Sequence, residues 1–224
     1  MSYRVNKKFT SHLKTLGFNK ANPPREWVSV KSGALCAIAM TPSLSGRPGY
    51  QDVSANGSFK LSIAIEFANA HVGYTDVIDR PEFNGFGVSH IRAALTRSAA
   101  IAGPQRRDVW DPTLISPDET IADAIKAIDK QAMPFFEEWT NPSHAYQQLT
   151  SDDLPNGPDE AGPAGNARLF VLGQPGSSAR EMNLASLAAT LERWDDEAAH
   201  IERILETRGH DPVYVERLAY LRSL

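Results

Sequence analysis

Cysteine is almost missing from this chain of 224 residues, which contains a single one, Cys36. One thiol cannot form an internal disulfide or supply the several cysteines of a structural zinc site. Long hydrophobic runs are missing too, since the longest spans seven residues, at 34–40, whereas a membrane-spanning helix needs roughly 20. No apolar stretch of signal-peptide length follows the first residues. We therefore expect a cytoplasmic protein with no membrane partner, and a buried Cys36.

Motifs for common chemistries are also missing. Residues 169–180 resemble a phosphate-binding loop, but no glycine stands five residues after Gly173, and no lysine follows Lys130. The six histidines include no pair three to five residues apart, so the sequence has no local zinc motif. A Gly-x-Ser-x-Gly elbow, which would carry a nucleophilic serine, is absent. We therefore predict no metal and no cofactor, and the sequence assigns no catalytic residue.

The sequence patterns that are present predict one helix and several strands in the first half of the chain. Apolar residues at helical spacing predict an N-terminal helix over residues 5–16. Strands are expected at 27–30 and 35–40, joined by a hairpin turn at Ser32-Gly33. Strict alternation of apolar and other residues predicts a half-buried strand at 59–67. Residues 90–97 alternate similarly, with a helix as the alternative, and Val109-Trp110 is a candidate edge strand.

Helix signals follow these strands. Ser116-Pro117-Asp118-Glu119 combines a capping serine, a first-turn proline and a glutamate three residues after the cap. The helix is expected over residues 120–132, with Pro134 ending or kinking it, and Asn141-Pro142 opens a shorter one. Together, these elements predict an α+β fold: a mainly antiparallel sheet of four or five strands, an N-terminal helix and packed helices.

The composition changes at residues 151–166, which contain three prolines, three glycines and four acidic residues but no basic one. We therefore predict a core domain at 1–150, a linker at 151–166 and a helical hairpin at 167–224. One long helix is expected to begin near Leu184 and end at Gly209, and a last helix to begin at Asp211-Pro212. The apolar face of this hairpin is too large to remain exposed. The hairpin therefore docks on the core or pairs with another copy of the chain.

Several short motifs occur in a recognisable order. They are Phe9-x3-Leu-x2-Leu-Gly-Phe18, Arg25-x-Trp27, the alternating strand, His90-Ile-Arg-x-x-Leu95, Asp108-Val-Trp110 and Met133-Pro-Phe-Phe136. This succession resembles the bacterial family known as domain of unknown function 4304, over roughly residues 5–150. The resemblance implies an α/β fold with an antiparallel sheet and brings no established activity. Some members of that family look like components of toxin–immunity or defence loci, which is an association and not a mechanism.

The net charge of −4 conceals a polarised chain. Residues 1–31 hold seven basic side chains and one acidic one, whereas residues 181–206 hold seven acidic and two basic ones. These segments either neutralise each other or recruit a partner of opposite charge. The candidate binding residues are Asp195, Asp196, Glu197, Glu202, Arg106, Arg107 and Trp110. An acidic helix would suit the cationic groove of a nuclease toxin, whereas nucleic acid is disfavoured because interleaved aromatic residues are lacking.

These observations favour a non-enzymatic protein-interaction module of the immunity-like or defence-associated kind. Its partner would be a toxin, a defence component or a second copy of the chain. The alternative is a hydrolase-like enzyme with a non-local site in the 71–92 region, built from His71, Asp76, Asp79, His90 and Arg92.

Overall fold

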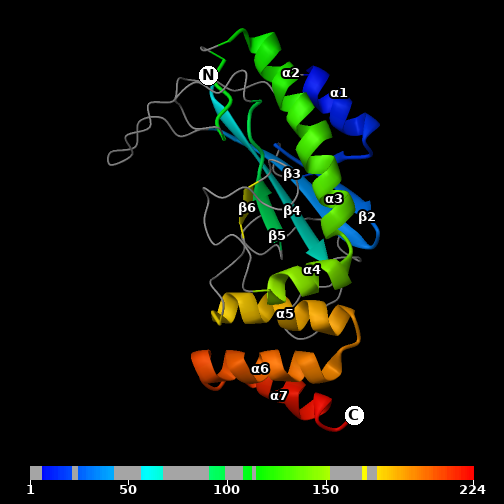
Figure 1. The fold of residues 1–224 in the computed structure, drawn as a ribbon, viewed down its shortest axis with the longest axis vertical. Helices are drawn as coiled ribbons and strands as arrows, with labels where there is room; N and C mark the ends of the chain where they lie inside the picture. Colours follow the sequence, from blue (N-terminus) through cyan, green and yellow to red (C-terminus); the bar gives the residue numbers. More distant parts are fainter. Residues whose placement is uncertain are drawn as a thin grey trace, which may run out of the picture.

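In the computed structural model of the chain, the described residues are 7–21, 25–42, 57–67, 91–98, 108–112, 115–151, 168–170 and 176–224. Their strands form one sheet in sequence order, each antiparallel to the next (Figure 1). The strands are β1 (Asn19–Ala21), β2 (Glu26–Lys31), β3 (Ala34–Pro42), β4 (Phe59–Phe67), β5 (Ile91–Ala94) and β6 (Arg168–Phe170). The α+β class with an antiparallel sheet is therefore confirmed, although the described sheet has six strands.

The strands with local sequence signals lie where they were predicted. The turn between β2 and β3 places Ser32 at φ 49° and Gly33 at φ 78°, the positive angles that a tight hairpin turn requires. β4 occupies the whole alternating segment, and β5 forms a strand, not a helix, over part of residues 90–97. Val109-Trp110 is reduced to one bridge, between Trp110 and Phe59.

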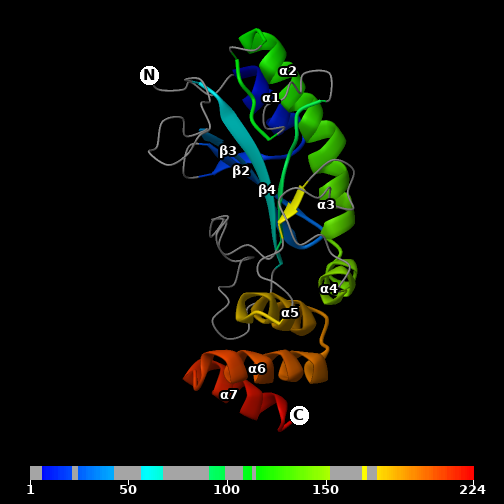
Figure 2. The ribbon, with the colours of Figure 1, turned by 60° about the vertical axis from the view of Figure 1, so that its left-hand side comes forward.

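Helices cover one face of the sheet. They are α1 (Lys7–Thr15), α2 (Pro117–Ala127), the π-helical turn η1 (Ile128–Ala132) and α3 (Met133–Trp139). α2, η1 and α3 run on as one long helix across the sheet, with α1 beside α2 (Figure 2). The predicted capping box at Ser116 and Glu119 is present.

Pro134 neither ends the long helix nor leaves it regular. In η1 the amide of Met133 donates to the carbonyl of Ile128, five residues back instead of four. A proline has no amide hydrogen and its ring crowds the carbonyl of the preceding turn. The wider π turn accommodates this change, so the helix continues through the proline into α3.

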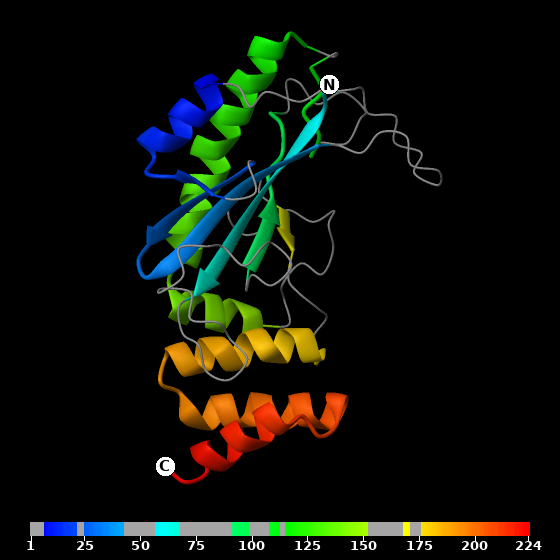
Figure 3. The ribbon, with the colours of Figure 1, turned by 180° about the vertical axis from the view of Figure 1, so that it is seen from behind.

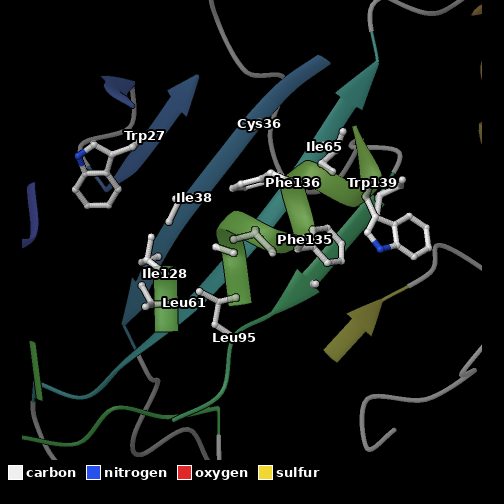
Figure 4. Packing of buried hydrophobic residues seen from close by; sticks show 14 of the residues in the cluster. Trp27, Cys36, Ile38, Leu61, Ile65, Leu95, Ile128, Phe135, Phe136 and Trp139 are labelled. Atoms are coloured by element: carbon white, nitrogen blue, oxygen red, sulfur yellow. The ribbon is translucent and has the colours of Figure 1, made fainter. Parts of the chain in front are cut away.

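Large side chains fill the space between the sheet and the long helix (Figure 4). Ile38 and Leu61 from the strands and Phe135 and Phe136 from α3 belong to one core cluster and are essentially inaccessible to solvent. The equally buried Trp27 packs against Phe9 of α1, with ring centroids 5.4 Å apart. The predicted burial of Cys36 is confirmed, since its side chain is fully buried in this core. Burial raises the pKa of the Cys36 thiol to about 12, against a smaller opposite effect of the Lys31 charge.

The last helices stack beyond one end of the sheet (Figure 3). α4 (Pro142–Thr150) is followed, after β6, by α5 (Ser178–Thr190), α6 (Trp194–Arg208) and α7 (Pro212–Leu221). The prediction of one long helix from Leu184 to Gly209 is wrong, because the chain turns at residues 191–193, where Glu192 has φ 56°. The described part of the predicted hairpin is therefore three helices and a strand.

The C-terminal helices pack on the core of the same chain. Leu184, Leu187 and Ala188 of α5 belong to the main hydrophobic core. Ile201 and Leu218 belong to a second cluster that joins α5, α6 and α7. Of the two alternatives left by the sequence, the structure therefore shows docking on the core. Residues 152–167, which include all of the predicted linker except residue 151, lie outside the described residues.

Candidate functional site

A buried chain of three polar side chains joins α4, α5 and α6. His200 of α6 lies between Glu181 of α5 and Tyr146 of α4. Its Nδ1 is 2.7 Å from Oε2 of Glu181, and its Nε2 is 3.0 Å from the hydroxyl of Tyr146. His200 and Glu181 are each 4% exposed, and Tyr146 is 6% exposed. We call these residues the junction triad.

The short contact with Glu181 determines which nitrogen of His200 carries hydrogen. A carboxylate oxygen and an unprotonated ring nitrogen would repel each other at 2.7 Å, so Nδ1 carries a hydrogen and donates it to Glu181. In a neutral ring, Nε2 then accepts the hydroxyl hydrogen of Tyr146. Arg203 adds a second donor to Glu181, since its Nη1 lies 3.2 Å from the same Oε2. The buried carboxylate is thereby satisfied by two donors.

Charged side chains of the α5–α6 turn surround Tyr146. The guanidinium of Arg193 lies over the tyrosine ring, 4.6 Å from its centroid, and the Nε of Arg193 is 2.6 Å from Oδ2 of Asp196. Burial raises the pKa of Tyr146, and the charge of Asp196 acts in the same direction. Arg193 and Arg203 oppose these effects. The phenol is therefore a neutral hydrogen-bond donor at physiological pH.

Local sequence signals position the three helices. The side chain of Asn141 accepts hydrogen bonds from the amides of Ser143 and His144 and so caps the N-terminus of α4. Ser177 caps α5 in the same way, which places Glu181 in the first turn, where a negative charge is favourable. Two nitrogens of Arg180 donate to the carbonyl of Leu149 at the end of α4, at 2.7 and 3.0 Å. α4 and α5 are therefore held together beside the triad.

The triad resembles the carboxylate–imidazole–hydroxyl chain that activates a nucleophile in hydrolases. Here the hydroxyl belongs to a tyrosine that is 6% exposed, and its pKa is raised instead of lowered. A nucleophile needs access to substrate and ready loss of its proton. The geometry therefore favours connection of the three helices over nucleophilic catalysis.

A second buried ion pair connects α6 to α7. Both oxygens of Glu197 accept hydrogen bonds from Arg217, at 2.8 and 2.9 Å, and Glu197 is 1% exposed. Glu197 was a predicted binding residue, but its carboxylate lies inside the helical unit and is neutralised there. The sequence could not show this, because Arg217 lies 20 residues further along the chain.

The other three acidic candidates lie at the surface of α6. Asp195 is exposed, Asp196 pairs with Arg193, and the exposed Glu202 pairs with Arg222 at 2.6 Å. Asp195 and Glu202 also lie in line with Glu206, because seven and eleven residues correspond closely to two and three helical turns. We call the exposed residues Asp195, Glu202 and Glu206 the α6 acidic stripe.

Trp110, another predicted binding residue, belongs to the core. It is fully buried, it stacks on Phe59 with ring centroids 5.8 Å apart, and its indole donates to Asp123 at 3.0 Å. Its side chain therefore has no surface with which to bind a partner. Arg106 and Arg107 lie outside the described residues, and so do His71, Asp76, Asp79 and His90 of the alternative hydrolase site. Arg92, the described member of that site, is half-buried in β5.

Sequence reasoning missed the junction triad. Its members are separated by 54 residues between Tyr146 and His200 and by 19 between Glu181 and His200. One signal was available: His200 lies three residues after Glu197 and four before Ile204, so all three share one face of α6. A histidine on the apolar face of a helix needs a buried polar partner.

No three His, Cys, Asp or Glu side chains lie close enough to hold a metal ion within the ranges given above. Among the same residues, the structure contains no helix that combines the length and the apolar character needed to cross a bilayer. No protein-family model matches the chain, and neither a curated protein nor a solved structure is significantly similar to it.

Proposed function

We propose that this chain is a non-enzymatic protein-interaction module whose α6 acidic stripe faces a basic surface of a protein partner. One observation carries the proposal: two buried acids of the helical unit are distinct from three exposed acids on one side of α6. Glu181 and Glu197 are buried and neutralised by side chains of neighbouring helices. Asp195, Glu202 and Glu206 are exposed on one side of α6. Only the second set can act on a partner.

The charge balance of the helical unit supports the same proposal. Residues 176–224 contain nine acidic side chains and six arginines, so this part of the chain is negative. In the described contacts, acidic side chains of α5 and α6 form ion pairs with Arg203, Arg217 and Arg222. Surface charges of one sign raise the rate of association with a partner of opposite charge and select against others. A basic protein is therefore the partner class that fits.

The immunity-like or defence-associated role rests on the family resemblance of residues 5–150. Within that role, we propose a cytoplasmic complex with a toxin whose functional groove is cationic. A second copy of this chain is a less suitable partner, because two acidic stripes would repel each other.

The test compares two double variants with the same change of charge. Asp195→Asn/Glu206→Gln removes two charges from the stripe, and Asp118→Asn/Glu137→Gln removes two exposed charges from the long helix. Each pair includes one acid in the first turn of its helix, so effects on the helix dipole are matched. The immobilised chain is exposed to lysate of its native host at moderate salt, and proteins that it retains are purified for kinetic binding measurements.

We expect a basic protein that binds the wild-type chain and the Asp118/Glu137 control equally. The stripe variant should associate more slowly with it and show a weaker dependence on salt. Equal association rates for the two variants, or retention of no protein at moderate salt, would contradict the proposal.

A further inference from the structure

We propose that one side of α7 docks a basic amphipathic helix of the protein partner, with Tyr220 as the apolar anchor of the contact. α7 is the outermost helix of the C-terminal stack (Figure 1). The side in question carries Val213, Tyr220 and Leu224, and we call these three residues the α7 apolar row. The inference rests on the proposed function, because the partner is the same basic protein, and it adds an apolar contact to the α6 acidic stripe.

Exposure distinguishes the α7 apolar row from the rest of the described surface. Four large hydrophobic side chains are exposed among the described residues, and three of them form this row: Val213 at 41%, Tyr220 at 53% and Leu224 at 69%. Tyr220 and Leu224 follow Val213 by seven and eleven residues, close to two and three helical turns. The amides of Ser223 and Leu224 bond to the carbonyls of Tyr220 and Leu221, so the chain continues to wind up to the end of the row. Single exposed apolar residues are ordinary, whereas an aligned set marks an interaction site.

Neighbouring side chains hold the ring of Tyr220 in place. The guanidinium of Arg217 lies 5.1 Å from the ring centroid of Tyr220 and 5.8 Å from that of Trp194. Both oxygens of Glu197 bind this guanidinium, so its position is fixed from within the helical unit. An exposed ring with a fixed orientation loses little conformational freedom when a partner covers it. Tyrosine is also among the residues that contribute most to the binding energy of protein interfaces.

The charges beside the row indicate a basic occupant. Glu216 is exposed and lies between the first two residues of the row along α7, one helical turn from each. The charge of Arg217 is already neutralised by its buried ion pair. Trp194, which shares the Arg217 guanidinium with the anchor, is followed directly by Asp195 of the α6 acidic stripe. A second copy of the chain would bring the same acids against these, whereas a basic partner complements them.

The spacing along α7 favours a helix as the docked element. From Val213 the chain reaches Arg217, Tyr220 and Leu224 in steps of four, three and four residues, which is the spacing of a seam between two helices. The row extends over three turns, about 16 Å at 1.5 Å per residue. An amphipathic helix of that length can lay its apolar side on the row. Its basic flanks would then face Glu216 and the α6 acidic stripe.

The test uses the full chain and two synthetic peptides of equal length and charge. In the first peptide, leucine recurs at helical spacing among lysines, and in the second every leucine is replaced by glutamine. Binding is followed by NMR through the backbone amides of the chain. The leucine peptide should bind more tightly than the glutamine peptide and should shift the amides around Val213 and Tyr220. The glutamine peptide should shift only amides near the α6 acidic stripe, and its binding should be lost at high salt.

Variants with matched controls identify the anchor. Tyr220→Ala should weaken binding of the leucine peptide about tenfold, whereas Tyr220→Phe, which keeps the ring, should stay within about twofold of the wild type. Val213→Ala should weaken binding about threefold, and the same change at Val30, the exposed valine of β2, should have no effect. The amide spectrum of each variant shows whether it is folded, and Val213→Ala keeps the test decisive if Tyr220→Ala is not.

Equal affinities of the leucine peptide for the wild type and the variants of the row, or amide shifts that avoid α7, would overturn the inference. A dimer of the chain alone that is lost in Tyr220→Ala would also overturn it, since a second copy would then cover the row. The stripe variant Asp195→Asn/Glu206→Gln tests the proposed function separately, because it should weaken binding of both peptides. If it does so while Tyr220→Ala has no effect, the proposed function stands and this inference fails. If neither peptide binds, both fail.

Discussion

Both polar groups of the Gln131 side-chain amide form hydrogen bonds with the backbone of Thr96. Oε1 of Gln131 accepts from the Thr96 amide at 2.9 Å, and Nε2 donates to the Thr96 carbonyl at 2.7 Å. Thr96 lies two residues after the end of β5, and a side chain of the π turn η1 takes the place of a neighbouring strand there. The long helix is thereby connected to the backbone at the end of β5.

Replacing Gln131 by Met would keep the volume and remove both hydrogen bonds. Each buried backbone group left without a partner costs about 1–3 kcal/mol. We expect the urea midpoint to fall with an unchanged slope of the transition. Gln147→Met on the exposed side of α4 is the control and should change stability by less than about 0.5 kcal/mol. A similar small effect for both variants would show that the Thr96 contacts contribute nothing to stability.

The single thiol provides a second prediction. The pKa of Cys36 is about 12 in the folded chain, because burial disfavours the thiolate, whereas an unfolded cysteine ionises near 8.5. Above pH 8.5 the unfolded state therefore loses a proton that the folded state keeps, and the stability of the fold decreases as pH rises. The limiting slope is about 1.4 kcal/mol per pH unit.

Denaturant unfolding at several pH values between about 8.5 and 10 measures this slope, in the wild-type chain and in Cys36→Ala. The upper limit avoids the ionisation of tyrosines near pH 10. The variant should lose most of the pH dependence. A thiol reagent should label Cys36 of the native chain no faster than the fold opens. Rapid labelling under native conditions would mean that Cys36 is accessible and would contradict its burial.

The parts of the fold that the sequence predicted have local causes. The Ser116–Glu119 capping box, the Ser32-Gly33 turn and the alternation over 59–67 each depend on neighbours within a few residues. The features that the sequence did not predict depend on pairing between distant residues or on the conformation of the backbone. β6 is three residues long and owes its existence to pairing with β5, some 75 residues earlier in the chain. The turn after α5 escaped detection because apolar residues continue at helical spacing from Leu187 through Leu191 to Trp194.

The candidate site was less predictable than the fold for the same reason. Charge counting identified the acidic character of residues 181–206 but could not separate buried acids from exposed ones. That separation depends on arginines contributed by another helix, such as Arg217 for Glu197. The triad needs three helices to meet, and no spacing rule relates Tyr146 to His200 across 54 residues.

Two ion pairs, one from α6 to α7 and one from α6 to the residue that follows α7, allow a direct comparison of buried and exposed acids. Glu197 and Arg217 have side chains that are 2% and 9% exposed, whereas those of Glu202 and Arg222 are 46% and 65% exposed. Glu197→Gln leaves Arg217 as a buried charge without its counterion and should cost about 3–5 kcal/mol. Glu202→Gln should cost about 0–1 kcal/mol, because water solvates Arg222. Hydrogen exchange of α7 amides should increase in the first variant alone, and equal effects would contradict the burial of the Glu197 pair.

The capping box of α2 predicts an acid-dependent contribution to stability. Glu119 accepts hydrogen bonds from the side chain and backbone of Ser116, and these lower the pKa of the Glu119 carboxyl. A lowered pKa stabilises the fold above the unfolded value near 4.3, and this stabilisation is lost as pH falls through the folded value. Ser116→Ala should destabilise the fold by about 1 kcal/mol at pH 7. The difference between the wild type and this variant should shrink below pH 4, and a constant difference would argue against the bonds to Glu119.

The turn between α5 and α6 predicts a reversal in the effect of glycine. Glu192 has φ 56°, where a side chain with a Cβ is strained and glycine is not. Glu206 lies within α6 on the exposed side, where glycine is destabilising by roughly 0.5–1 kcal/mol relative to alanine. We therefore expect Glu192→Gly to be more stable than Glu192→Ala by about 1 kcal/mol. At residue 206 the order of the two variants should be the opposite. Thermal unfolding of the four variants measures both differences. If the alanine variant were the more stable one at both positions, α5 would continue into α6 as one helix.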